Sequence, residues 1–306
     1  MIEFASPEAP AGTNDRALVV VRVHESDGAA HAINQGTDVY LRVDNVTDPY
    51  RRATVDEIEW FSEKRKKCKE VKDQILKPAE LHAEQYLLRL RAHHRWPTTR
   101  PRCRLVCWSS PAFPRAELST PEALLQTAPS QRVTLGQATV PYDHPVPVQG
   151  GIRFPSAITP NLFYTEVNSF GLIYSVVGIG NPDDAGSDSV HCGLVGSVLA
   201  ATLRYALQLY MAVGYFGLVE FRVSLSPAMN LHLSVPDVTL GQQMVEREDY
   251  RSMEHEIRIR IFGSVGDLSD RWLDKAKEAY REFLWSFGWN ATQSLVASHF
   301  GRFGIR

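Results

Sequence analysis

Residues 37–60 read TDVYLRVDNVTDPYRRATVDEIEW, an order of residue types that predicts a strand, a turn and the start of a helix. In Val39–Val43 every second residue is aliphatic, which is the two-residue period of a strand with one apolar face. Thr54 and Glu57 fit a capping box, in which the hydroxyl and the carboxylate each accept a hydrogen bond from a backbone amide. The stretch therefore predicts a strand that leads through a turn into a helix beginning near residue 54.

The predicted helix has an apolar stripe, and most of its remaining surface is basic. Apolar residues recur at helical spacing at Ile58, Phe61, Cys68, Val71 and Ile75. Five basic residues lie within 64–69. Pro78 predicts that the helix ends or kinks there, because proline lacks the amide N–H and its ring clashes with the preceding turn. A second helix is expected over residues 79–94, so that the two form a helical hairpin or a bent connector.

Charge is distributed unevenly along the 306 residues, although the net charge is only −2. Residues 51–104 carry 15 basic and 8 acidic side chains, whereas residues 1–50 carry 3 basic and 8 acidic ones. A basic middle section is the electrostatic footprint expected of a protein that contacts nucleic acid. The alternative is that these charges only solvate an exposed helical face.

The cysteines predict a reducing environment. Cys103 and Cys107 lie four residues apart in a run that predicts a strand over 102–108. Such residues are about 13 Å apart along a strand, whereas a disulfide needs Cα atoms within about 7 Å. We therefore expect both in the core as small apolar residues, and with Cys68 and Cys192 isolated we expect a cytoplasmic protein.

The sequence gives no sign of a membrane partner. The N-terminal residues carry neither the basic nor the apolar region of a signal peptide. Arg204 divides the most apolar segment, residues 189–219, into two uncharged runs of about 15 residues, fewer than the roughly 20 that a spanning helix needs. We interpret the segment as a buried helix over 191–213 followed by a strand over 217–225.

The C-terminal two thirds of the chain alternate between strands and helices. Further strands are expected at 162–177, with a break near Gly171, and at 255–262. In the second of these, Ile257, Ile259 and Ile261 are expected to point inward, and Arg258 and Arg260 outward. A loop is predicted at 109–115, a short helix from Ser119 and another after Asn290. Ser269 or Asp270 is expected to cap the final long helix.

This order of elements predicts an α+β fold rather than a parallel doubly wound sheet. The expected parts are an incomplete strand-turn-helix unit over residues 1–58, a basic helical connector over 54–97, and a mixed-sheet α+β domain over 98–306.

The opening stretch also shares its order of features with a known family. Ten positions carry the likeness: Tyr40, Arg42, Val43, Asn45, Thr47, Ala53, Thr54, Asp56, Glu57 and Ile58. The pattern resembles the C-terminal end of the AlbA_2 domain of Schlafen-type proteins, where an aromatic-x-Arg-Val strand precedes a helix opening of the type Ala-Ser-x-Glu-Glu-Ile. The resemblance covers about residues 15–60 and implies a bacterial DNA-binding or transcriptional regulatory protein.

The sequence departs from that family in two respects. Asp44 stands where the family has glycine, and residues 48–52 form a longer connection than is typical. The family's acidic-Phe-Lys and glycine-rich segments lie well upstream of the strand, and residues 1–16 leave no room for them. Because the acidic residues of the family's nucleases belong to that upstream part, we expect a truncated or divergent form and assign no catalytic residue.

Candidate contacts to nucleic acid gather around the turn and on the basic helix. They are Arg42, Asn45, Thr47, Arg51, Arg52, Lys64, Lys66 and Lys67. Arginine and lysine bind phosphate oxygens, and asparagine and threonine add hydrogen bonds to the backbone of the nucleic acid. In the alternative interpretation, Arg42 pairs with Asp44 or Asp56 and the other cations are solvated.

A second group of candidates lies in the strand region 162–177. Tyr164, Glu166 and Asn168 alternate on one face and are predicted to line a pocket, unless they belong to a half-exposed sheet face. No metal or cofactor is expected, because His93–His94 and His191–Cys192 lack further ligands at metal spacing.

The sequence thus favours a nucleic-acid-associated regulatory or defence-related protein, non-catalytic, that binds DNA or RNA and carries a C-terminal sensing or binding domain. One alternative is an interaction module without nucleic-acid binding, whose C-terminal aromatic residues pack on a partner or on a second copy in a homo-oligomer. These residues are Phe283, Trp285, Phe287, Trp289 and Phe300. The other alternative is a Schlafen-like nuclease, which requires the family's upstream half.

Overall fold

The structure is a computed structural model. It describes residues 2–5, 20–23, 32–33, 38–42, 50–52, 54–92, 103–114, 116–155, 163–179, 181–182, 188–234 and 250–306. The chain divides into two compact units, residues 1–63 and 64–306, and the division falls inside the long helix α1 (Val55–Ala92). The predicted division at residues 58 and 97 stays a prediction.

The first unit is built from short antiparallel pairs. β1 (Ile2–Ala5) pairs with β2 (Val20–Val23), and β4 (Asp38–Arg42) pairs with β3 (Ala32–Ile33) and with β5 (Tyr50–Arg52). The strand predicted over 39–43 is confirmed as β4. The chain then returns along it as β5, which the sequence did not predict.

The predicted capping box at the start of α1 is confirmed. The Thr54 amide donates to Glu57 Oε2 at 2.9 Å, and the Glu57 amide donates to Thr54 Oγ1 at 3.3 Å. Each side chain therefore satisfies a backbone donor that the first turn of the helix leaves without an intrahelical partner.

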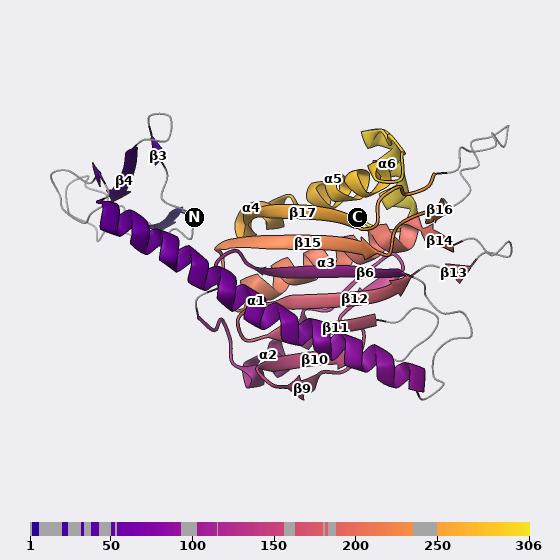
Figure 1. The fold of residues 1–306 in the computed structure, drawn as a ribbon, viewed down its shortest axis with the longest axis horizontal. Coiled ribbons are helices and arrows are strands. Elements are labelled where there is room, and N and C mark those ends of the chain that lie inside the picture. The colour runs from indigo at the N-terminus through magenta and orange to yellow at the C-terminus, as the bar shows by residue number, and fades with distance from the viewer. Residues whose placement is uncertain are drawn as a thin grey trace, which may run out of the picture. The chain divides into compact units, whose positions relative to one another are not determined.

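The second unit is organised on one antiparallel sheet of seven strands (Figure 1). In spatial order they are β17 (Ile257–Ser264), β15 (Leu218–Ser226), β6 (Cys103–Pro111), β12 (Ile173–Ile179), β11 (Phe163–Asn168), β10 (Gly151–Pro155) and β9 (Val146–Val148). The α+β prediction is confirmed. The break predicted near Gly171 is also present, because this glycine has φ of 82° in the turn between β11 and β12.

Two smaller sheets accompany the large one. β13 (Asn181–Pro182), β14 (Asp188–His191) and β16 (His232–Ser234) form a three-stranded sheet, and β7 (Val133–Leu135) pairs with β8 (Ala138–Val140). β14 and β16 run parallel. Among the described strands, the predicted mixture of parallel and antiparallel pairing therefore occurs only in the small three-stranded sheet.

Helix α3 (Cys192–Ala212) is the centre of the main core, which confirms the predicted buried helix. It packs on β6 and β12, on the β7–β8 hairpin, and on α4 (Val265–Asp270) and α5 (Trp272–Trp285). By length and composition α3 could cross a membrane, but 89% of its most apolar window is buried in this fold, as in the core helix of a soluble protein. Its Arg204 lies over the Trp272 ring at 4.8 Å, where the charge is stabilised by the aromatic face.

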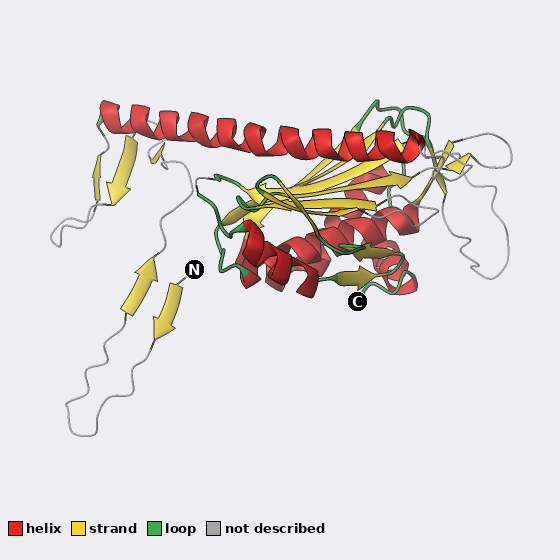
Figure 2. Cartoon of the chain, turned by 90° about the horizontal axis from the view of Figure 1, so that it is seen from below, coloured by secondary structure: helices red, strands yellow, loops and turns green. Residues whose placement is uncertain are grey.

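The opposite face of the sheet is covered by the part of α1 that belongs to the second unit (Figure 2). Ala79 and Ala83 are almost fully buried and pack against Trp108, Tyr164 and Tyr174. Because alanine has only a methyl side chain, the helix approaches these large aromatic rings closely.

Of the predicted end or kink at Pro78, the end is wrong, and so is the separate second helix over 79–94, because one helix is continuous from residue 55 to residue 92. Pro78 is exposed, while Ile75 and Leu76 before it and Ala79 and Ala83 after it all belong to one hydrophobic cluster with the sheet. Packing on both sides of the proline therefore outweighs its cost of about 3 kcal/mol in a helix interior.

Two further boundaries differ from the sequence prediction. Residues 109–111 continue β6 instead of forming a loop, because Ser109 and Ser110 are buried and pair with β15. Ser269 and Asp270 lie in the last turn of α4 and do not cap the long helix α5, whose N-cap position is Arg271. The short helix α4 is capped by Ser264, whose Oγ accepts from the Asp267 amide at 3.1 Å. The helices predicted from residue 119 and after Asn290 are confirmed as α2 (Pro121–Ser130) and α6 (Gln293–Arg302).

Replacing Pro78 by alanine should stabilise the protein, because it restores a backbone donor and removes the ring clash on an exposed position. We expect the free energy of unfolding to rise by about 1–3 kcal/mol in urea titrations. The control is Gln85→Ala, an exposed substitution on the same helix that should change it by less than about 0.5 kcal/mol. A loss of stability in Pro78→Ala would contradict this account.

Candidate functional site

The outer face of the sheet carries a row of polar and aromatic residues contributed by six adjacent strands. From strand to strand, the register places these directly opposite one another: Arg153, Glu166, Tyr174, Trp108, Arg222 and Arg260. Their neighbours along the strands, such as Cys107, Phe221 and Ile261, are buried in the main core on the other side. Strand alternation therefore places the whole row on the face that α1 partly covers.

At one end of this row, the carboxylate of Glu220 binds three cations. Lys72 of α1 donates to its Oε2, and the Nε atoms of Arg222 and Arg260 each lie 2.7 Å from its Oε1. The side chain of Glu220 is only 5% exposed. The contact joins α1 to two strands of the sheet through one buried anion.

Burial and charge act in opposite directions on the groups of this cluster. Burial alone would raise the pKa of Glu220, but the hydrogen bond and charge of Lys72, together with Arg222, hold that pKa below its usual value. The pKa of Lys72 is also lowered, because its burial and the repulsion by Arg222 and Arg260 outweigh the attraction by Glu220. The site therefore favours the ionised carboxylate and holds more positive charge than that carboxylate neutralises.

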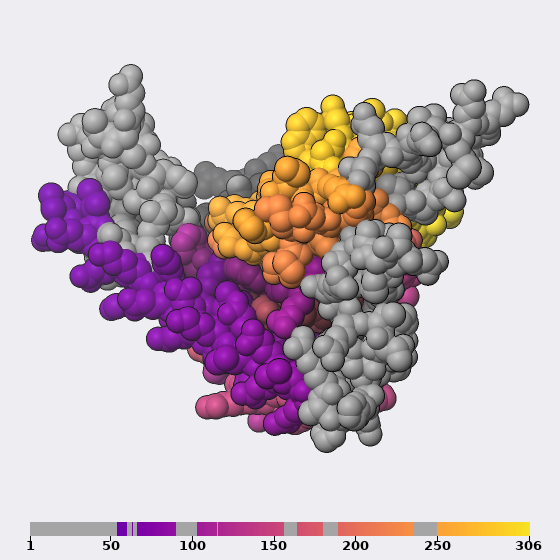
Figure 3. All heavy atoms as spheres, turned by 45° about the vertical axis from the view of Figure 1, so that its right-hand side comes forward, coloured from indigo at the N-terminus to yellow at the C-terminus, as the bar shows by residue number. Residues whose placement is uncertain are grey.

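Three guanidinium groups of this region reach the surface, and we call Arg222, Arg258 and Arg260 the arginine face. Their side chains are 52%, 78% and 60% exposed. Figure 3 shows the orange atoms of β15 and β17 at the surface beside purple atoms of α1. Arg258 also pairs with Glu256 at 2.6 Å.

Aromatic rings lie within this cluster of charges. Trp108 has Lys72 5.0 Å and Arg222 5.2 Å from its ring centroid, and Arg260 lies 5.3 Å from the Phe262 ring. Each contact is a cation–π interaction, which orients the cation over the ring face. Phe262 is 47% exposed and so offers part of its ring to a ligand.

The close placement of these cations lowers the stability of the sheet, and the fold alone does not explain why they are there. Arg222 and Arg260 are direct cross-strand partners, and like charges in that position destabilise a sheet. Counting Lys72 and Arg258, four cations share two carboxylates among the described residues, those of Glu220 and Glu256. Guanidinium forks of this kind match the oxygen atoms of phosphate or carboxylate groups.

Further along the row, α1 covers two of the predicted pocket residues. His82 Nδ1 lies 3.1 Å from Glu166 Oε2, and the Tyr164 hydroxyl donates to the same oxygen. Asn168 instead holds the β11–β12 turn, because its Oδ1 accepts from the Leu172 amide at 2.9 Å. The structure therefore brings Tyr164 and Glu166 together with His82 of α1 and assigns Asn168 to a turn, while the predicted pocket stays a prediction.

The residues predicted to contact nucleic acid lie in and near the first unit. Arg42 is on β4, and Arg51 and Arg52 are on the β5 strand that pairs with it. Lys66 and Lys67 are exposed on α1, which also contains Lys64, while Asn45 and Thr47 lie outside the described residues.

Most of the C-terminal aromatic residues are buried in the core or packed against it. Phe283, Phe287 and Phe300 are at most 1% exposed, and Trp289 stacks on Tyr250 with a centroid distance of 5.0 Å. Trp285 alone of the five is largely exposed, at 61%. A partner that binds this region would therefore meet Trp285 rather than an aromatic cluster.

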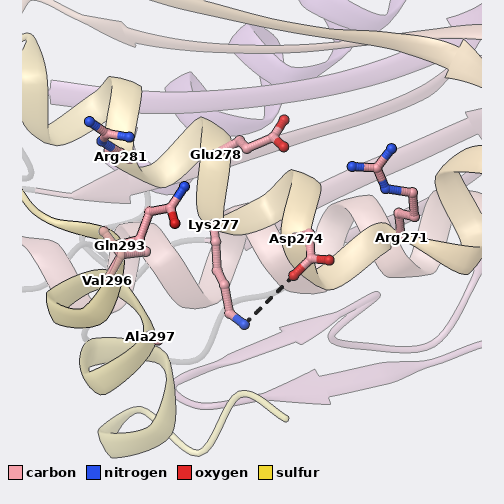
Figure 4. Close-up of a pocket in the computed structure, with 8 residues that line it drawn as sticks. All are labelled: Arg271, Asp274, Lys277, Glu278, Arg281, Gln293, Val296 and Ala297. Carbon is pink, nitrogen blue, oxygen red and sulfur yellow. Dashed lines mark ion pairs between the residues drawn. The ribbon is translucent and has the colours of Figure 1, made fainter.

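A pocket of about 380 Å³ lies between α5 and α6 (Figure 4). Its charged lining is nearly balanced, with Arg271, Lys277 and Arg281 against Asp274 and Glu278. Lys277 Nζ lies 3.9 Å from Asp274 Oδ1. Within the described ranges, no group of three or more histidine, cysteine, aspartate or glutamate residues could hold a metal ion, in this pocket or elsewhere.

Comparison with known proteins adds no relative: no protein-family model, no curated protein and no solved structure matches the chain. The AlbA_2 resemblance therefore stays a proposal.

Part of the arginine face is predicted by the sequence, but its role as a site is not. The alternation in residues 255–262 predicted an outward Arg258 and Arg260, which is confirmed, and the run over 217–225 contains Glu220 and Arg222 at the same two-residue spacing. The available signal was that both strands alternate charged with apolar residues. The missing information was that the two strands are neighbours.

Replacing Glu220 by glutamine should destabilise the protein, because it leaves Lys72, Arg222 and Arg260 without their shared anion. Removing one partner of a fully buried ion pair costs about 3–5 kcal/mol, and the exposure of both arginines reduces this, so we expect about 2 kcal/mol in urea titrations. The control is Glu278→Gln, whose exposed pair with Lys275 should contribute less than about 1 kcal/mol. Equal effects in the two variants would contradict the role of Glu220.

The contribution of Glu220 should also depend on pH. Since its pKa in the folded protein lies below the usual 4.5, its ionised form stabilises the fold above about pH 4.5, and this stabilisation is lost as the pH falls through the lowered value. The difference in unfolding free energy between the wild type and Glu220→Gln should therefore be constant from about pH 7 to 5 and shrink in stronger acid. A difference that persisted undiminished at about pH 2 would count against the ion cluster.

Proposed function

We propose that the protein is a non-catalytic nucleic-acid-binding protein of a regulatory or defence-related kind, and that its C-terminal unit binds the nucleic acid on the arginine face. The observation that supports this best is the exposure of Arg222, Arg258 and Arg260 on two adjacent strands, where two of them share a single buried carboxylate. A sheet face of this kind attracts a polyanion, because its cations are not fully neutralised by the protein itself.

Phosphate groups suit the geometry of the arginine face. Arg222 and Arg260 are held side by side by Glu220, so their donors are oriented before a ligand arrives and lose little side-chain freedom on binding. The bound phosphate would relieve the repulsion between the two guanidinium groups. Glu220 then acts as a positioning residue, which fixes the arginines without touching the ligand.

The exposed Phe262 favours a single strand over a duplex. Proteins that bind single-stranded nucleic acid combine a positively charged surface with aromatic rings on which bases stack. Phe262 lies beside Arg260 with about half of its side chain exposed, so a base could stack there while the phosphates contact the arginines.

The residues predicted from the sequence belong to the same proposal. Arg42, Arg51 and Arg52 on the β4–β5 hairpin and the exposed Lys66 and Lys67 on α1 are further contacts for a phosphate backbone. Together with the AlbA_2 resemblance they connect this function to DNA-binding regulators. The Schlafen-like nuclease remains the alternative, and it differs in predicting metal-dependent cleavage of the bound strand.

The proposal is tested by titrating labelled single-stranded RNA, single-stranded DNA and duplex DNA into the protein over a range of salt concentrations. We expect single strands to bind more tightly than the duplex, with affinity falling as salt rises. The Arg222→Ala/Arg258→Ala variant should lower the slope of the logarithmic salt dependence by about 0.7 for each phosphate that the protein no longer binds.

The matched control removes two arginines elsewhere. Arg271→Ala/Arg281→Ala changes the net charge equally but lies on the α5–α6 pocket, so it should leave the slope nearly unchanged. Equal reductions of the slope in both variants would show a non-specific charge effect and overturn the assigned site. Cleavage of the labelled strand on addition of Mg²⁺ or Mn²⁺ would favour the nuclease.

A further inference from the structure

β17 is an edge strand of the seven-stranded sheet and is eight residues long. It pairs with β15 on one side, and among the described residues no strand pairs with its other side. An edge strand presents a row of unpaired backbone N–H and C=O groups, to which another extended chain can add.

A groove of about 230 Å³ lies between this edge and α5. Three consecutive residues of β17 line one wall, namely Arg260, Ile261 and Phe262. The other wall consists of Lys275, Glu278, Ala279 and Glu282. These four are spaced as one face of a helix over two turns, so α5 runs beside the strand along the groove.

A groove between an edge strand and a helix suits an extended peptide. The peptide's main chain would pair with β17, and its side chains would point alternately to the two sides of the enlarged sheet. One side carries Arg258 and Arg260, and the other side meets Glu278 and Glu282 of α5. Charge complementarity therefore selects a peptide in which acidic and basic residues alternate.

The charges on α5 support a basic residue on that side. Glu278 already pairs with Lys275 at 2.6 Å, but Glu282 has no cation partner among the described residues. Partial burial raises the pKa of Glu282, so a cation placed beside it would stabilise its charged form. A lysine or arginine of the peptide would supply that cation.

The same charges disfavour a second copy of this chain as the occupant. Two sheets that join edge to edge through a two-fold axis keep their like faces on the same side. Arg258 and Arg260 of one copy would then oppose the same arginines of the other, which destabilises the pairing. An acidic side chain in that position has the opposite effect.

We propose that the groove between β17 and α5 binds an extended peptide segment, added as an eighth strand to the sheet, with acidic residues toward Arg258 and Arg260 and basic residues toward Glu278 and Glu282. This site goes beyond the proposed function and does not depend on it. Both proposals use Arg258 and Arg260, but the main-chain pairing with β17 and the contacts with Glu278 and Glu282 belong to the peptide alone.

The test uses a fluorescein-labelled octapeptide of alternating glutamate and lysine, titrated with the full chain and followed by fluorescence anisotropy. We expect saturable binding with a dissociation constant below about 1 mM, and an affinity at least about tenfold weaker in Glu282→Lys, which places like charge beside the bound lysine. A peptide with alternate backbone nitrogens methylated should bind at least about tenfold more weakly, because it cannot complete the ladder.

Three results would overturn this proposal. They are the absence of saturable binding up to about 1 mM, equal binding of the methylated peptide, and an unchanged affinity in Glu282→Lys. A concentration-dependent dimer in light scattering that Glu282→Lys abolishes would assign the groove to a second copy instead. The Arg222→Ala variant separates the two proposals, because Arg222 lies on β15 and does not line the groove. It should weaken nucleic-acid binding and leave the affinity for the peptide unchanged.

Discussion

The second unit depends on a buried carboxylate that three cations share. Glu220 lies on β15, and its partners come from α1, from β15 itself and from β17. Without this anion, Lys72 would be a largely buried ammonium group beside two guanidinium groups, which would weaken the packing of α1 on β15. The ion cluster therefore fixes the position at which α1 crosses β15, and the same contact determines which arginines remain at the surface.

From that contact onward, α1 is held mainly by packing. Ala79 and Ala83 bring the helix against Trp108, Tyr164 and Tyr174, and His82 contacts Glu166 about three turns beyond Lys72. The helix thus crosses the sheet from β15 to β11, and its Lys72 and His82 each contact a carboxylate of the sheet. The part of the face near β17 is left open, and there Arg258 and Arg260 point outward together with the half-exposed Phe262.

Much of the fold could be predicted from the sequence because it follows from local periodicity. The buried helix over 192–212, the alternating strand at 257–264 and the capping box of Thr54 and Glu57 each show their structure in a few consecutive residues. The site could not be predicted in this way. Glu220 and Lys72 are 148 positions apart, and the pairing of β15 with β17 joins strands separated by a long connection. The continuity of the helix through Pro78 could not be predicted locally either. The sheet whose packing outweighs the cost of the proline comes later in the chain.

Because β17 is an edge strand, it belongs to two different surfaces, the arginine face of the sheet and the groove beside α5. An edge strand of alternating pattern must direct its polar residues toward water, and arginine there protects the edge against pairing with copies of itself. This protection comes from the positive charge of the arginines and not from steric blocking, because the backbone N–H and C=O groups of the edge remain available for pairing. The same arginines that repel a second copy would attract an anionic strand on the open face and an acidic side chain at the edge. Selectivity between these ligands then comes from what lies next to the arginines: the Trp108 and Phe262 rings on the face of the sheet, and the carboxylates of Glu278 and Glu282 beyond its edge.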